Sequence, residues 1–227
     1  MMRRPPGRIG PILSGAPNGW GKQLAERAAQ FAALAVTAEE RRELEALLID
    51  QFVSATLEVE QLDATNALHE VIRLTKAEGL RARLTPELLI KMGGDLRTNT
   101  DERATAQVSI AYLRQAIENA CAWFAADSFA ELNPVEQAAI VLLRLASLQP
   151  FAQANQATAR VAASLFTLRA ELPPVIILPQ MQAAFRRAMA EAEQMNMQPL
   201  VELITEAVSS TLDDMIGFVR QARGERE

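Results

Sequence analysis

Helix-start signals restrict the fold of this chain more than any other feature of its sequence. Thr85-Pro86-Glu87 and Asn133-Pro134-Val135-Glu136 each place a capping residue before a proline, and Thr37-Ala38-Glu39-Glu40 has Thr at the cap with Glu three residues later. A capping side chain accepts a hydrogen bond from one of the free N–H groups at the start of a helix, and a proline there has no N–H group to satisfy. Apolar residues recur at helical spacing after these signals, and strands do not alternate with helices. The pattern predicts an all-α protein.

The chain is expected to have three parts. Residues 1–20 are rich in Pro, Gly and Arg, which is typical of a flexible leader. Residues 21–80 are expected to form an N-terminal helical region, and residues 81–227 a helical core with C-terminal helices. Residues 98–110 lack helical periodicity and are the only candidate for extended structure, so a short flap with at most one small β-hairpin is expected there, its strand around Gln107–Ile110. In all, about eight helices are expected. Residues 138–148, apolar on nearly every side, are predicted to form the middle of the bundle.

Composition excludes several classes of function. The net charge is -5, with 23 Lys+Arg against 28 Asp+Glu, so no basic excess favours nucleic acid as a partner. Cys121 is the single cysteine, which rules out a disulfide framework within the chain and favours the cytoplasm. No run of about 18 apolar residues occurs, so no membrane span is expected. His69 is the single histidine and has no cysteine nearby, so it supports neither a metal site nor a catalytic triad.

The segment Leu148–Arg160 follows the apolar helix and carries the most specific motif. It resembles the signature loop of Fic (Fido) domains, His-Pro-Phe-x-Asp/Glu-Gly-Asn-Gly-Arg-x-x-Arg, with Pro150, Phe151, Asn155 and Arg160 in register. The helices on either side also resemble those of the family, so the resemblance covers roughly residues 40 to 210. It implies a Fic-like helical bundle. In active members the loop binds ATP and Mg²⁺ and moves AMP onto a protein hydroxyl.

This loop departs from the family pattern at five positions. Gln149 stands where the family has its catalytic His, Gln153 replaces the acid that holds the metal, Ala154 and Gln156 replace two glycines, and Ala157 replaces the first arginine. A glutamine has no proton that titrates near pH 7, so it cannot act as the base. One amide oxygen is a poor ligand for strongly hydrated Mg²⁺. We therefore expect a catalytically inactive Fic-like protein with no cofactor and no metal, which serves as a binding or regulatory module.

The remaining loop residues have structural and binding interpretations. Asn155 is expected to cap the following helix. If any anion or nucleotide binds, the candidates for its contacts are Asn155, Arg160 and Gln153. Ser54-Ala55-Thr56-Leu57-Glu58 resembles the inhibitory motif of the family, Ser/Thr-x-x-x-Glu-Gly/Asn, although Val59 replaces the final Gly or Asn. That resemblance implies that Glu58 has a regulatory role and pairs with Arg160; a solvated surface pair is the alternative.

Two other functions stay open from the sequence. The first is a diverged nucleotidyltransferase, which would transfer AMP or another phosphate ester to protein hydroxyls and would need ATP and Mg²⁺. The second is an antitoxin-like or dimerising partner of another protein, with the N-terminal helices as its interface. The sequence does not identify the protein partner, and it allows a homodimer.

Overall fold

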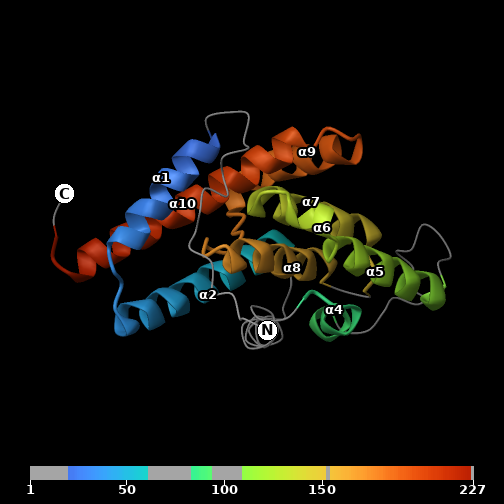
Figure 1. Ribbon diagram of the computed structural model, residues 1–227, viewed down its shortest axis with the longest axis horizontal. Helices are drawn as coiled ribbons and strands as arrows, with labels where there is room; N and C mark the ends of the chain where they lie inside the picture. The colour runs from blue at the N-terminus through green and yellow to red at the C-terminus, as the bar shows by residue number, and fades with distance from the viewer. Residues whose placement is uncertain (1–19, 61–82, 94–108, 152–153, 226–227) are drawn as a thin grey trace, which may run out of the picture.

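The computed structural model describes residues 20–60, 83–93, 109–151 and 154–225, and the side chains of residues 20 and 57–60 are not among the described parts. Within these ranges all regular structure is helical, which confirms the predicted all-α fold (Figure 1). The elements are α1 (Trp20–Ala33), α2 (Ala38–Glu60), α4 (Pro86–Gly93), α5 (Ile110–Phe124), α6 (Asp127–Ala130), α7 (Pro134–Leu148), α8 (Asn155–Arg169), the 3-10 turn η2 (Pro179–Met181), α9 (Gln182–Glu193) and α10 (Gln198–Ala222). The helix expected at residues 63–78, the expected leader except for its last residue, and His69 lie outside these ranges.

The helix-start signals act as predicted. Asn133 Oδ1 accepts the N–H groups of Val135 and Glu136 at 3.0 and 2.9 Å, while the Glu136 carboxylate accepts the Asn133 N–H at 3.2 Å. Thr85 Oγ1 accepts the Leu88 N–H at 3.2 Å at the start of α4. Each contact satisfies a donor that has no partner within its helix, which is why these helices begin where they do.

Helix α8 shares the middle of the bundle with α7, which contains residues 138–148 and contacts α8, α10, α5 and α9. Every residue of α8 from Ala157 to Thr167 is buried, whereas Arg144 and Ser147 of α7 are exposed. In Figure 1 α8 lies centrally, and α7, α4 and α2 contact it. Most side chains of α8 are small, and its hydroxyl groups bond locally: Ser164 Oγ donates to the Arg160 carbonyl at 2.8 Å. Local bonding of this kind lets a helix of moderate hydropathy be buried completely.

Helix α5 begins earlier than the sequence indicated. Ser109 is its N-cap, with Oγ accepting the Tyr112 N–H at 3.1 Å, and Ile110 is its first residue. The expectation that a strand extends to Ile110 was therefore wrong, because a capping serine directly before this β-branched residue starts a helix. The rest of the expected flap, residues 94–108, lies outside the described residues.

The two terminal parts of the described chain are held together. Helices α1 and α10 run side by side (Figure 1), and Arg27 Nε lies 2.8 Å from Asp213 Oδ1 between them. At the end of α10, Arg223 donates to both carboxylate oxygens of Glu40, at 2.7 and 2.9 Å, and to the Leu34 carbonyl at 3.0 Å. Since Glu40 also accepts the Thr37 N–H at 2.8 Å, one carboxylate caps α2 and fixes the turn between α1 and α2 to α10.

Glu40 should make stability depend on pH in the acid range. The hydrogen bond from Arg223, and next the one from the Thr37 N–H, lower the pKa of Glu40 from 4.5 to about 2. A carboxyl with a lowered folded-state pKa stabilises the protein fully above its unfolded pKa, and this contribution is lost as the pH falls towards the folded value. We expect the melting temperature of wild type to fall more steeply between about pH 5 and pH 2 than that of Glu40→Gln. Glu39→Gln is the control and should keep the wild-type slope. Equal slopes for the two variants would contradict this role of Glu40.

Candidate functional site: the loop between α7 and α8

A left-handed residue stands at each end of the loop between α7 and α8. Gln149, directly after α7, has φ 44° and ψ 58°, and Ala154, directly before α8, has φ 54° and ψ 30°. Pro150 and Phe151 lie buried between them. Residues 152 and 153 are outside the described part of the loop, so the candidate Gln153 is not placed.

Asn155 stabilises the loop instead of capping α8. Its Oδ1 accepts the Phe151 N–H at 2.8 Å, and its Nδ2 donates to the Phe151 carbonyl at 2.8 Å. The N-cap of α8 is Ala154, which makes no side-chain bond, so the predicted capping role of Asn155 was wrong. The side-chain amide has one acceptor and one donor group, and both match the backbone of a single loop residue. Asn155 therefore fixes the chain across four residues.

The substituted positions differ in their surroundings. The side chain of Gln149 is exposed at the C-terminus of α7, while Ala157 is buried in the first turn of α8. A residue with a Cβ in the left-handed region costs on the order of 1 kcal/mol, so Ala154 is strained where the family has glycine. Gln156 has no such cost, because it lies within the right-handed helix α8. Only one of the two glycine positions thus requires a positive φ.

Phe151 is fixed by a glycine that no sequence motif singled out. The ring is 2% exposed and lies against Gly93, the last residue of α4. A Cβ built on Gly93 would overlap three carbons of this ring. A glycine at the end of a helix is usually explained by the backbone conformation of the C-cap. The sequence near Gly93 therefore does not indicate that it contacts a ring far away in the chain.

Gly93→Ala should destabilise the protein by about 1 to 3 kcal/mol, because the new methyl group forces the buried Phe151 ring to move. Urea unfolding would measure the change, with Gly217→Ala as the control. Gly217 lies in α10, and beyond its neighbours in that helix no atom is within 4 Å of the place that a Cβ on it would take, so alanine there should be neutral or slightly stabilising. In a double-mutant cycle, Gly93→Ala should cost less when Phe151 is already alanine. Additive costs would show that the ring and Gly93 are independent.

Among the residues that the structure describes, Arg160 has the largest fully buried side chain. It is 1% exposed, and its guanidinium carbon lies 5.4 Å from the centroid of the Phe185 ring of α9. A cation over an aromatic face is stabilised, but a buried charge also needs compensation by an opposite charge or by hydrogen bonds. Helix α2 contacts α8, and Phe52 and Val53 on α2 are buried in the core. Glu58 belongs to the same helix, and its side chain lies outside the described part.

Other candidate chemistry is sparse in the described residues. They contain no group of three or more His, Cys, Asp or Glu side chains that could hold a metal ion. Burial, and next the charge of Glu87, raises the pKa of the Cys121 thiol to about 12, which keeps it a neutral and poor nucleophile. No helix in the described ranges is long and apolar enough to cross a membrane.

Sequence comparison connects this loop and its surroundings to a known family. Residues 62–167 match the sequence model of the Fic/DOC family. Protein adenylyltransferase fic-1 of Caenorhabditis elegans is 26% identical over 113 residues, which is 50% of this chain and 22% of the relative. Protein adenylyltransferase Fic of Drosophila virilis is 30% identical over 104 residues, 46% of this chain and 21% of the relative. The matched regions thus span about a fifth of the length of these relatives.

The fold is also similar to solved Fic structures. The structure of Fic-1 from Caenorhabditis elegans superposes with a TM-score of 0.79 at 18% identity, covering 92% of this chain and 73% of that one. A Fic domain containing signaling protein from Bacteroides thetaiotaomicron gives a TM-score of 0.77 at 13% identity, covering 90% of this chain and 99% of that one. The helices of the bundle, the signature loop between α7 and α8 and the sequence match agree with one another. Residues 62–167 of this chain therefore carry the sequence of a Fic (Fido) domain, and the described helices have the fold of solved Fic structures.

Proposed function

We propose that this Fic domain lacks AMP-transferase activity and serves as a protein-binding or regulatory module. The observation that carries the proposal is Gln149, which stands exposed at the end of α7 where the family has its catalytic histidine. Transfer of AMP to a hydroxyl requires a group that accepts the hydroxyl proton. A side-chain amide is not basic enough to accept it, so the loop has no general base at this position.

The loop residues do not fit ATP and Mg²⁺. Gln153 offers a neutral amide where a carboxylate would hold the ion. Ala157 is a buried methyl group where the family arginine would clamp a phosphate. Both polar groups of Asn155 are bonded to the Phe151 backbone. These residues therefore support no reaction step that involves a nucleotide.

The scaffold around the loop supports a binding role. Phe151 is buried against Gly93 and its backbone is bonded to Asn155, so the described residues of the loop are held by contacts within the chain. We further propose that Glu58 on α2 pairs with Arg160 and so fixes α2 to the central helix. A preformed surface of this kind loses little conformational entropy when a partner protein binds.

An AMP-transfer assay tests the proposal. Wild-type protein and Gln149→Ala would be incubated with adenine-labelled ATP, Mg²⁺ and candidate acceptor proteins, with an active Fic enzyme as the positive control. We expect no incorporation by wild type above the level of Gln149→Ala. Gln149 is exposed, so its replacement should leave the fold intact. Incorporation by wild type that Gln149→Ala abolishes would overturn the proposal and favour a diverged nucleotidyltransferase.

A further inference from the structure

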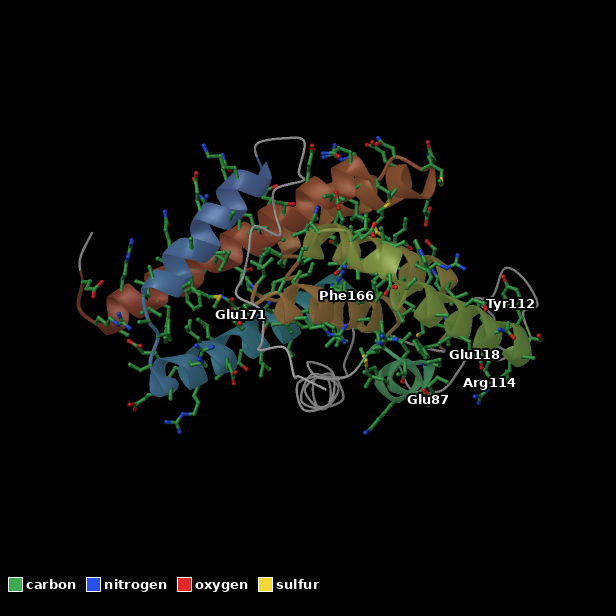
Figure 2. All side chains as sticks on the ribbon, in the orientation of Figure 1. Glu87, Tyr112, Arg114, Glu118, Phe166 and Glu171 are labelled. Carbon is green, nitrogen blue, oxygen red and sulfur yellow. The ribbon has the colours of Figure 1, made fainter. Side chains whose placement is uncertain are left out.

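Helix α5 carries an unusual share of exposed apolar surface. Four large apolar side chains are exposed in the described residues, and three of them are on α5: Ile110 at 44%, Tyr112 at 61% and Trp123 at 46%. Tyr112 extends from α5 at the edge of the molecule (Figure 2). The opposite face of the helix is buried in the core, so α5 is held rigidly while it presents these side chains. Aromatic residues on a rigid element are typical anchors of protein interfaces.

The exposed residues of α5 have the spacing of a helix-pairing seam. With 3.6 residues per turn, Ala111, Gln115, Glu118 and Ala122 form one stripe, at intervals of four, three and four. Tyr112, Asn119 and Trp123 border that stripe on one side. The alanines at both ends allow a second helix to approach closely, and Gln115 Nε2 donates to Asn119 Oδ1 at 3.2 Å between them. This is a surface that a helix fits.

The stripe is complementary to itself when it is reversed. A two-fold axis near residue 117 places Ala111 against Ala122 of a second copy and Tyr112 beside Trp123 of that copy. The same axis brings Arg114 of each copy within reach of Glu118 of the other copy, so the interface contains two such pairs. Each of these side chains is exposed, so it can reach a second molecule, although Trp123 also packs on Phe124 and Phe129 of its own chain. We infer that α5 binds α5 of a second copy of this chain in antiparallel orientation.

This interface differs from the N-terminal one that the sequence left open. The apolar residues Leu24, Leu44 and Phe52 of α1 and α2 are buried within the molecule, so much of the apolar surface of those two helices already packs inside the chain. Arg27 also ties α1 to α10. A contact through one helix of 15 residues, about 22 Å long, buries less area than a standard interface. The dimer should therefore be reversible and depend on concentration.

Sedimentation velocity of the full chain tests the inference directly. Between roughly 1 and 500 μM, wild type should change from the monomer mass to twice that mass, as a weak interface requires. Ala122→Arg, which places a long charged side chain in the seam, should remain a monomer at every concentration. Ala184→Arg, at an exposed position of α9, is the matched control and should behave as wild type. A wild type that is monomeric throughout, or a dimer that Ala122→Arg leaves unchanged, would overturn the inference.

A charge swap tests the antiparallel register. Arg114→Glu brings two carboxylates together across the axis, and Glu118→Arg brings two guanidinium groups together, so each should weaken the dimer several-fold. The double variant should return towards wild-type affinity, because it restores opposite charges. A double variant no tighter than either single variant would contradict the register. Circular dichroism of each variant identifies loss of folding, and none of these readouts depends on the AMP-transfer assay.

Discussion

Restoring the family residues of the signature loop should create a site for ATP and Mg²⁺ in this scaffold. The fivefold variant is Gln149→His, Gln153→Asp, Ala154→Gly, Gln156→Gly and Ala157→Arg. It should bind ATP with a dissociation constant at least about a hundredfold below that of wild type, because the carboxylate and the arginine each contribute on the order of 1.5 to 3 kcal/mol through charge-assisted contacts. Two features of the scaffold already favour such a site. Ala154 has the left-handed backbone that glycine adopts without strain, and Arg160 is in place on α8.

Equilibrium dialysis with labelled ATP, with and without Mg²⁺, would measure this gain. A fourfold variant that keeps Gln149 should bind ATP nearly as well as the fivefold variant but transfer no AMP, since it lacks the base. Comparing the two separates the loss of binding from the loss of proton transfer. A fivefold variant that folds and still binds no nucleotide would show that the scaffold outside the loop has also lost the site.

Removing the proposed partner of Arg160 should be the most destabilising single change near the site. A buried ion pair that loses one member typically costs about 3 to 5 kcal/mol, because the remaining charge stays buried without compensation. We therefore expect Glu58→Gln to lower the free energy of unfolding by an amount of this order. Replacing both members, with Glu58→Gln and Arg160→Met, should recover part of that loss, since no buried charge then remains.

Urea unfolding of the two single variants and the double variant gives the coupling free energy. Glu43→Gln, at an exposed position of the same helix, is the matched control and should change stability by less than about 0.5 kcal/mol. If Glu58→Gln is as mild as Glu43→Gln, Glu58 does not compensate Arg160. The proposed fixing of α2 to the central helix would then be wrong.

Local chemistry at helix starts made much of this fold predictable. The caps at Thr37, Thr85 and Asn133 all form the expected hydrogen bonds, because capping depends on residues within four positions of one another. The Fic-like bundle and the location of the signature loop between two helices were likewise confirmed. In these cases the signal lies in adjacent residues, and distant packing does not change it.

Features that depend on packing were harder to predict. The burial of α8 was missed because Thr158, Ser164 and Thr167 make the helix look moderately polar, although each is buried. Asn155 has a strong preference for N-caps, but its amide finds both a donor and an acceptor on Phe151. The contact between Phe151 and Gly93 joins segments that are distant in the chain, so no local pattern records it.

The loop between α7 and α8 is proposed to have neither a base nor a metal ligand, and therefore not to handle ATP. Calorimetric titration of the wild-type protein with ATP and Mg²⁺, up to millimolar concentration, tests this proposal most directly. We expect no saturable heat of binding. A saturable one-to-one isotherm that disappears when Mg²⁺ is chelated would contradict it.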